Sequence, residues 1–386
     1  MSGPLPLGLF YGAIYLWGGA ASPYMPVWFH HRGMTGAQIG LILSAPLLAR
    51  VITAPMVAMW ADGFGLRRTP LFLCGLLMAA TSALLAPHFG AIWWFAVWFI
   101  ASTAYSSIAP LTDVLVLARS QRDGFNYGWP RGIGSAAFIV GNLAMGALLV
   151  WRSPELLLLW LTVTAVTIAA AGWFLLPADP VGHAGETMSL KERMAGLSDL
   201  VGDRDFMLMV ISAGLIQSAH AFYYAFSTLA WKQQGIPENL TGILWGMGVA
   251  AEIAFLWFLE PWRRRIGARN LLVIGGVAAV VRWTALASSP PLWLLFPIQA
   301  LHVFSYAATF MGALEMTDRL STPRTASGAQ LINSALSGGV LSGLATLASG
   351  QLFDHWGTQG YLAMTAMSIL GLLGAIRLYS VRRLDD

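Results

Sequence analysis

Long apolar segments alternate with short polar breaks along nearly the whole sequence. A helix needs about 20 predominantly apolar residues to cross the hydrocarbon core of a bilayer. Twelve segments have about this length, and most breaks between them are short, so we expect successive helices to run antiparallel. The predicted helices cover residues 7–29, 36–61, 69–87, 91–118, 130–151, 155–177, 207–230, 240–260, 270–288, 291–316, 326–352 and 359–378.

The longest polar stretch, residues 178–205, separates the sixth predicted helix from the seventh. It contains the charged run Leu190-Lys-Glu-Arg-Met194, and it shows no catalytic spacing of residues. We interpret it as a solvated cytoplasmic linker with room for one short amphipathic helix. The predicted organisation is therefore an N-terminal six-helix bundle over 1–177, a linker over 178–205 and a C-terminal six-helix bundle over 206–386.

The composition supports a membrane protein. Hydrophobic residues make up 57% of the chain and charged residues 10%, whereas soluble domains carry about 25% charged residues. The single Cys74 excludes a disulfide framework and a multi-cysteine metal site. No nucleotide-binding loop, nucleophile–base motif or metal-ligand motif occurs in an apolar segment. We therefore expect no enzyme, no cofactor, no metal and no nucleic-acid partner.

The positive charges predict the orientation in the membrane. Sixteen of the 22 Lys and Arg residues lie in loops after even-numbered helices or at the C-terminus, three lie in the opposite loops, and three lie within helices. Because cytoplasmic loops are enriched in Lys and Arg, both termini are predicted to be cytoplasmic. The N-terminal segment has no Lys or Arg, so the first apolar run is expected to be a retained helix. We predict a multi-pass protein of a bacterial-type inner membrane.

The two halves show weak internal similarity at an offset of 202 residues. Gly40-Leu-Ile-Leu-Ser corresponds to Gly242-Ile-Leu-Trp-Gly, and Phe64-Gly-Leu-Arg to Ile266-Gly-Ala-Arg. The same offset places Arg50 on Glu252. Because an even number of helices separates these segments, the halves are expected to be parallel repeats.

Distinctive sequence segments occur at residues 22–30, 49–50, 61–68, 110–113, 127–135, 218–226, 248–252, 281–282 and 301–304. These segments resemble the major facilitator superfamily, in particular its lactose permease branch of oligosaccharide and nucleoside proton symporters. The resemblance is strongest to the 3-phenylpropionate permease family, and it covers nearly the whole chain. It implies two pseudo-symmetric bundles of six helices, twelve transmembrane helices in all, with the substrate site near the midplane between the halves.

Two departures from the family pattern affect the expected mechanism. In the loop after the second helix, Asp62, Gly65 and Arg68 are kept, and we expect them to form a conformational latch, although other positions of the loop motif differ. In the lactose permease pattern a carboxylate that transfers protons follows the His of the tenth helix by three residues. This chain has Ser305 there, so any coupling must use another acid.

Arg50 is isolated in a long apolar segment, which makes it a candidate binding residue. A charge near the bilayer centre costs a few kcal/mol and normally faces a partner or a cavity. Arg50 either forms a structural ion pair with an acid such as Asp113 or Glu252, or it offers a bidentate guanidinium to a substrate carboxylate. Asp113 and Arg131 are expected to face each other across a short loop. The resemblance implies that both contact substrate, and the alternative is a structural salt bridge.

Glu252 is the preferred proton carrier, with Asp113 and His302 as further coupling candidates. Arg282 and His302 are expected to complete the network around Glu252, and both are candidates for substrate contact. A lone His in an apolar helix is more often a hydrogen-bonded core residue than a relay, and this alternative weighs more for His220. Tyr223 and Tyr224 are candidates for stacking on an aromatic substrate.

These features predict a secondary active transporter that works by rocker-switch alternating access. The preferred substrate is an aromatic carboxylate similar to 3-phenylpropionate, imported together with a proton. The alternatives are a sugar or nucleoside proton symporter, a broad-range exporter, and a sensor built on a transporter fold. The expected partners are an organic anion, protons and the lipid bilayer, and we expect a monomer.

Overall fold

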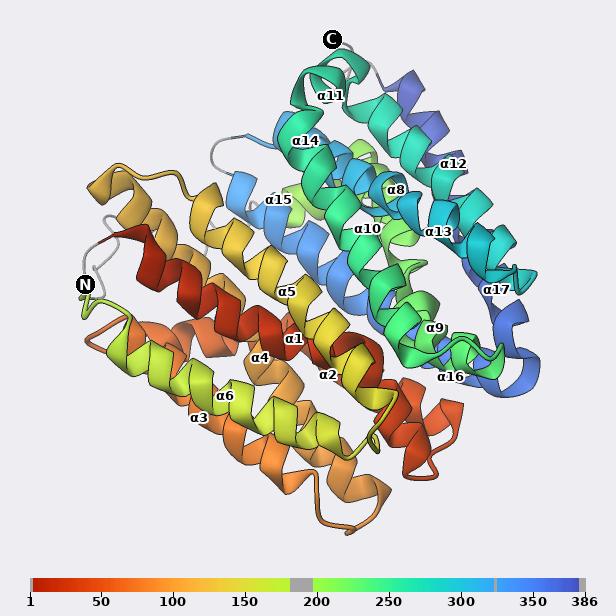
Figure 1. Cartoon of the computed structure of the whole chain (residues 1–386). Coiled ribbons are helices and arrows are strands. Elements are labelled where there is room, and N and C mark those ends of the chain that lie inside the picture. Colours follow the sequence, from red (N-terminus) through yellow and green to blue (C-terminus); the bar gives the residue numbers. More distant parts are fainter. Residues whose placement is uncertain (1–2, 181–196, 323–324, 382–386) are drawn as a thin grey trace. The chain divides into compact units, whose positions relative to one another are not determined.

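The computed structural model describes residues 3–180, 197–322 and 325–381, and these residues form helices and connecting turns without a named strand (Figure 1). The predicted all-helical membrane fold is therefore confirmed. The charged run 190–194 lies outside the described residues. The named helices are α1 (Pro4–His31), α2 (Gly36–Asp62), α3 (Arg68–Leu84), α4 (Ala91–Asp123), α5 (Gly128–Leu149), α6 (Leu156–Phe174), α8 (Arg204–Ser218), α9 (Ala221–Gln233), α10 (Glu238–Phe258), α11 (Glu260–Ile266), α12 (Ala268–Ala287), α13 (Leu292–Ala300), η1 (Val303–Ala308), α14 (Thr309–Arg319), α15 (Ala326–Asn333), η2 (Ser334–Leu341), α16 (Ser342–Trp356), η3 (Gly357–Gly360), α17 (Tyr361–Arg377) and η4 (Leu378–Ser380).

Each of the twelve predicted spans coincides with helix, but several spans are interrupted. The seventh span consists of α8 and α9, which are separated by a break at Ala219 and His220. The tenth and eleventh spans contain the π-helical segments η1 and η2. Hydrophobic periodicity cannot predict such interruptions, because the apolar character continues through them. π-Helical turns occur frequently at functional sites.

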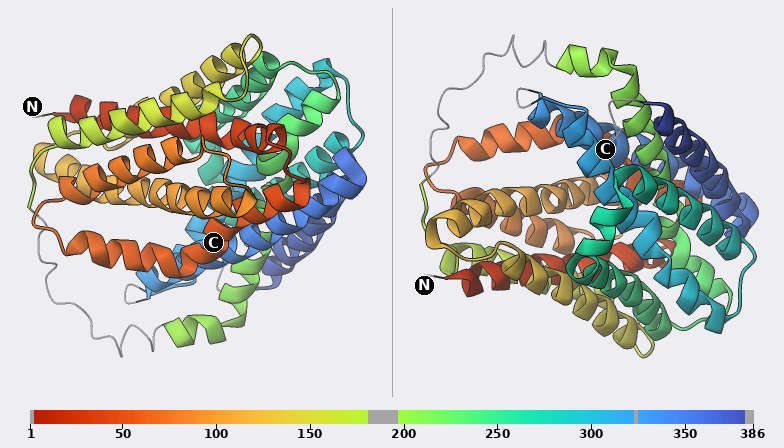
Figure 2. Two further views of the ribbon diagram at one scale, coloured as in Figure 1. Left: turned by 90° about the horizontal axis from the view of Figure 1, so that it is seen from below. Right: turned by 90° about the horizontal axis from the view of Figure 1, so that it is seen from above.

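The residue contacts divide the chain into two compact units, named unit 1 (Met1–His183 with Ser227–Gly246) and unit 2 (Ala184–Phe226 with Met247–Asp386). The predicted three-part division at residues 177 and 206 stays a prediction. In unit 1, α1 packs along α5 and α6, and α3 packs against α4 and α6. The views in Figure 2 show α1 and α6 side by side, as Figure 1 does.

Small residues allow the backbones of α5 and α10 to approach closely within unit 1. A Cβ atom added at Gly146 would lie 2.6 Å from the carbonyl oxygen of Glu238, and one at Gly242 would lie 2.8 Å from that of Asn142. The Tyr24 hydroxyl of α1 lies 3.2 Å from both of these carbonyl oxygens. A larger residue at either glycine would therefore push two helix backbones apart.

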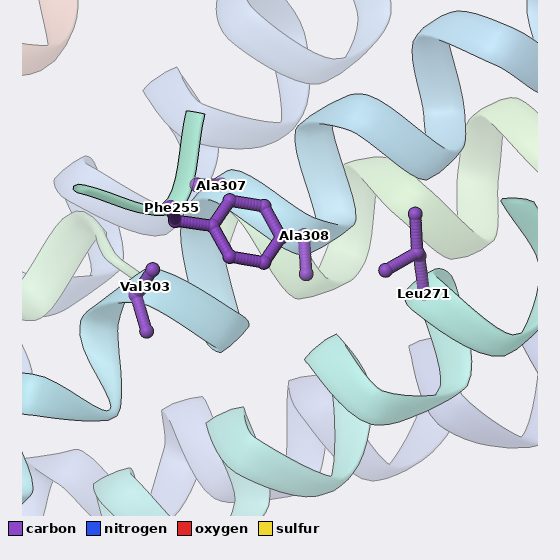
Figure 3. Close-up of a cluster of buried hydrophobic side chains, with 5 residues drawn as sticks. All are labelled: Phe255, Leu271, Val303, Ala307 and Ala308. Carbon is purple, nitrogen blue, oxygen red and sulfur yellow. The ribbon is translucent and has the colours of Figure 1, made fainter. Parts of the chain in front are cut away.

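Unit 2 is organised around α12, which packs against α14, α17 and η1, while α8 packs against α17 and η2. A hydrophobic cluster joins α10, α12 and the tenth span, and consists of Phe255, Leu271, Val303, Ala307 and Ala308 (Figure 3). Phe255 follows Glu252 by three residues on α10, and Val303 directly follows His302. This cluster therefore anchors the two helical segments that present these polar residues.

Candidate functional site

A buried polar network occupies the interior of unit 2, where the chain departs from regular α-helix. His220 lies in the break between α8 and α9, and His302 directly precedes the π-helical segment η1, which contains Ser305. Two backbone carbonyls at these irregular turns also contact side chains: Gln217 donates from Nε2 to the carbonyl of Tyr306 at 3.0 Å, and His220 Nδ1 lies 2.9 Å from the carbonyl of Gln217.

The centre of the network is a chain of three residues from three spans. Oε1 of Glu252 lies 2.6 Å from Nε2 of His302, and Nδ1 of the same imidazole lies 2.7 Å from Nη1 of Arg282. A guanidinium can only donate hydrogen bonds, so Nδ1 of His302 is the acceptor and Nε2 carries the proton. This geometry assigns a neutral His302 that donates to a carboxylate and accepts from a cation.

Arg282 is completely buried and has no direct contact with a carboxylate among the described residues. Nη2 donates to Oε1 of Gln299 at 2.8 Å, and Nη1 lies 3.4 Å from the hydroxyl oxygen of Ser305. The guanidinium carbon lies 4.6 Å from the ring centroids of both Tyr223 and Trp283. Aromatic faces and charge-assisted hydrogen bonds therefore hold this cation in place of a direct ion pair.

The network also includes His220, which is fully buried. Because Nδ1 of His220 donates to a backbone carbonyl, Nε2 is the acceptor in the neutral imidazole, and the Ser305 hydroxyl at 3.1 Å donates to it. The His220 and His302 rings lie 5.2 Å apart in an edge-to-face arrangement. Sequence reasoning gave His220 little weight, and only the break at residues 219–220 brings it to Ser305.

Exposure differs sharply within this network. The side chain of Glu252 is 19% exposed and that of His302 is 7% exposed, whereas Arg282 is fully enclosed. Tyr224 is 38% exposed, but Tyr223 is only 2% exposed. Among Glu252, His302 and Arg282, Glu252 is therefore the ionisable residue that a proton can reach most easily. Tyr224 is the more accessible of the two tyrosines.

Unit 1 contains a separate cluster around Asp113. The expected pair is present, since Nη1 of Arg131 lies 3.6 Å from Oδ1 of Asp113, and both side chains are 38% exposed. The same carboxylate oxygen accepts hydrogen bonds from the hydroxyls of Tyr127, at 2.8 Å, and Tyr11. The two tyrosine partners were not anticipated from the sequence, although Tyr127 belongs to a segment that carries the family resemblance.

The aromatic surroundings of Arg131 complete this cluster. Its guanidinium carbon lies 5.4 Å from the ring centroid of Tyr11 and 5.0 Å from that of Tyr15. Nη1 of Arg131 has no hydrogen-bond acceptor among the described residues. A half-exposed cation and a carboxylate therefore lie side by side, and together they can bind a ligand that both donates and accepts hydrogen bonds.

Arg50 is half-buried on α2, and no hydrogen bond or ion pair of its side chain occurs within the described ranges. Within unit 1, Asp113 pairs with Arg131 and not with Arg50. A buried metal centre is not formed either, since no three His, Cys, Asp or Glu side chains gather as metal ligands in the part of the chain that is described.

No hydrogen bond or ion pair joins the side chains of the expected latch residues Asp62 and Arg68 within the described part of unit 1. Arg68 donates to the carbonyl of Trp173 at 3.3 Å and stacks on its ring, whereas Asp62 is exposed. The conformational latch predicted for Asp62, Gly65 and Arg68 stays a prediction. An unexpected link lies nearby: Asp179 accepts two hydrogen bonds from the Arg119 guanidinium, and its carbonyl accepts one from the Arg67 amide at 2.9 Å.

Comparison with known proteins agrees with this architecture. A probable 3-phenylpropionic acid transporter from Escherichia coli (strain K12) is 26% identical over 366 residues, which cover 94% of each chain. A maltose permease from Geobacillus stearothermophilus is 28% identical over 382 residues, 95% of this chain and 92% of the permease. The crystal structure of the nucleoside transporter NupG has the same fold, with a TM-score of 0.84, 18% identity, and coverage of 98% of this chain and 99% of NupG.

The family comparison extends over the same region. The chain matches the MFS_1 like family over residues 6–363, which include both polar clusters and every predicted site residue. Since the match spans most of both units, this chain belongs to the MFS_1 like family and is a multi-pass membrane transporter of the major facilitator type.

Proposed function

We propose that this transporter is a proton symporter that imports an aromatic carboxylate of the 3-phenylpropionate type by rocker-switch alternating access. The main support for this proposal is the series of side-chain contacts from Glu252 through neutral His302 to Arg282. It places an acid that a proton can reach in electrostatic contact with an enclosed cation. Protonation of Glu252 leaves the Arg282 charge uncompensated, and binding of an anionic substrate restores the balance of charge.

Arg50 and Arg131 are the proposed partners of the substrate carboxylate. Both are partly accessible, and Arg50 has no protein acceptor in the described ranges, so its guanidinium is available for a bidentate contact. Arg282 is enclosed by Tyr223 and Trp283, so a substrate reaches it only after these rings move. The Tyr224 ring, which is the more exposed, is the proposed aromatic contact. The name of the 26% identical relative supports this substrate class.

A sugar or nucleoside is the second candidate substrate. Asp113 supports it, because a partly exposed carboxylate beside tyrosine hydroxyls is suited to accept hydrogen bonds from substrate hydroxyls. The name of the maltose permease relative points in the same direction. In this alternative, Asp113 and Arg131 bind hydroxyl groups, while Glu252 and His302 keep the coupling role.

The proposed setting is the bacterial inner membrane, with both termini in the cytoplasm and the chain acting as a monomer. The excess of Lys and Arg in one set of loops supports this orientation. Asp62, Gly65 and Arg68 are proposed to act as a latch that engages in another conformational state.

Uptake into proteoliposomes tests the proposed function. Labelled 3-phenylpropionate, maltose and a nucleoside are supplied separately, with and without an inward proton gradient. We expect gradient-driven uptake of the aromatic acid, which Arg50→Ala abolishes and Arg50→Lys retains in part. Accumulation of maltose or the nucleoside alone supports the second candidate. Absence of uptake, counterflow and efflux for all three contradicts both candidates, and binding without flux indicates a sensor.

A further inference from the structure

Seven buried side chains in unit 2 carry N–H or O–H groups that have no hydrogen-bond partner among the described residues. Four of the seven belong to Arg282 and residues grouped with it, and three of these four residues are aromatic or cationic. The unpartnered atoms of these four are Nε of Arg282, Nε2 of Gln299, Nε1 of Trp283 and the hydroxyl of Tyr361.

Contacts between these residues show that they form one group. Gln299 is bonded to Arg282 at 2.8 Å through its oxygen, so its amide nitrogen also lies close to the guanidinium. The Arg282 guanidinium carbon lies 4.6 Å from the Trp283 ring, and the Trp283 and Tyr361 rings stack with centroids 5.8 Å apart. Arg282, Gln299 and Trp283 are fully buried, and Tyr361 is 1% exposed.

The four unpartnered groups are all hydrogen-bond donors. The guanidinium, the amide nitrogen and the indole nitrogen can only donate hydrogen bonds, and the Tyr361 hydroxyl can also donate. Buried donors in native proteins almost always have an acceptor, because an unmade hydrogen bond leaves the desolvation cost of the donor uncompensated. Two acceptors beside Arg282 already accept from its Nη atoms: Nδ1 of His302 and Oε1 of Gln299.

We propose that this donor group, named the Arg282 donor site, binds a small hydrogen-bond acceptor, either a water molecule or a halide ion. A buried water normally has two to four polar partners, and the site offers that number of donors. A halide would use the same donors. Arg282 also belongs to the proposed coupling network, but the tests of this site require no transport.

Diffraction from the intact protein crystallised in sodium bromide distinguishes the two sources. A peak of anomalous density beside Nε of Arg282 and Nε2 of Gln299 identifies a halide, and ordinary density without an anomalous signal identifies water. Either result supports the site. The proposal is overturned if the four side chains are well resolved and no density lies beside their donor atoms. It is also overturned if all four donors bond to protein acceptors.

Isosteric variants provide a second test in solution. Trp283→Phe and Tyr361→Phe each remove one donor and keep an aromatic ring. If a halide is bound, each variant should weaken the apparent halide affinity by roughly 2- to 10-fold, measured as the midpoint of thermal stabilisation by bromide against gluconate at equal ionic strength. If water is bound, Trp283→Phe should remove or displace the ordered density.

The matched control is Trp245→Phe, because Nε1 of Trp245 already donates to Ser227 at 3.2 Å. It should leave both the halide response and the density at the Arg282 donor site unchanged. An equal effect of the Trp245 and Trp283 variants contradicts the proposal, since the effect would then reflect general loss of indole contacts.

Discussion

Nη1 of Arg282 donates a hydrogen bond to Nδ1 of His302 over 2.7 Å inside unit 2. This bond determines the tautomer of the imidazole, and the tautomer in turn lets Nε2 donate to Glu252 at 2.6 Å. A neutral histidine therefore transmits the effect of a buried cation to an acid at the edge of the network.

Glu252→Gln should uncouple transport from the proton gradient. The amide has a similar shape and still accepts a hydrogen bond from His302, but it cannot carry a proton. When two ligands are coupled, one typically changes the affinity for the other by about 5- to 150-fold. We expect the variant to lose this effect of the proton on substrate affinity, while substrate counterflow continues. Counterflow and gradient-driven uptake in proteoliposomes measure the two properties. Glu315→Gln is the control, because Glu315 pairs with Arg319 at 2.7 Å away from the network. Retained gradient-driven uptake in Glu252→Gln would assign the proton to another acid.

His302→Ala should destabilise the protein, because it removes hydrogen bonds to two charged groups at once. Hydrogen bonds to charged groups contribute about 1.5–3 kcal/mol each, so we expect a clear decrease of the thermal unfolding temperature in detergent. His302→Gln should recover part of the loss, since its amide can both donate and accept. Equal stability of His302→Ala and the wild type would show that the contacts of His302 with Arg282 and Glu252 are not stabilising.

Asp113→Asn tests the cluster in unit 1. The carboxylate accepts from Tyr127 and lies 3.6 Å from Arg131, so the neutral amide weakens both contacts. If Asp113 binds substrate hydroxyls, the variant should lose sugar or nucleoside affinity by roughly 10-fold or more. If the substrate is an aromatic acid held by Arg131, affinity should be retained or increase. Tyr127→Phe is the control for the loss of one hydrogen bond with the charge unchanged, and binding is measured by titration of the purified protein.

Gly146→Ala and Gly242→Ala should disturb the contact between α5 and α10. A methyl group at either position meets a backbone carbonyl within 2.8 Å, and overpacking of this kind typically costs about 1–3 kcal/mol. Thermal unfolding of the purified variants measures the loss. Gly246→Ala is the matched control on α10, because its added methyl would lie 3.4 Å from the flexible side chain of Ile139 and should be tolerated. If all three variants unfold at the wild-type temperature, the helices are not as close as described.

Arg119→Ala should release the segment around Asp179 from the end of α4. The Arg119 and Asp179 side chains are 14% and 17% exposed, so solvent screens their ion pair only in part. We expect a loss of roughly 1 kcal/mol in stability and faster proteolysis at residues 177–180. Arg122→Ala is the control, since Arg122 is 57% exposed and its pair with Asp179 is longer, at 3.6 Å. Equal cleavage rates for the two variants would show that Arg119 does not hold this segment.

Particular residues show where sequence reasoning succeeded. The pairing of Asp113 with Arg131 was predictable, because two opposite intramembrane charges on consecutive helices have few other partners. The grouping of Glu252, Arg282 and His302 was expected from the resemblance and from the cost of isolated charges in lipid. His220 was expected to be a hydrogen-bonded core residue, and it is buried and hydrogen-bonded. Gln299 and the tyrosines around Asp113 were missed, since neutral polar residues carry no comparable signal in an apolar helix.

The sequence by itself determined that the chain is a helical membrane protein with twelve apolar spans. The physical reason is that backbone polar groups in lipid must be satisfied within the segment, so long apolar runs have to be helices. Only the tertiary structure decided which polar side chains meet: the break at Ala219 and His220 and the π-helical turn after His302 rotate the following residues away from regular helical positions. Those rotations bring His220 to Ser305 and enclose Arg282 between two aromatic rings, and they depend on packing between spans that lie far apart in the sequence.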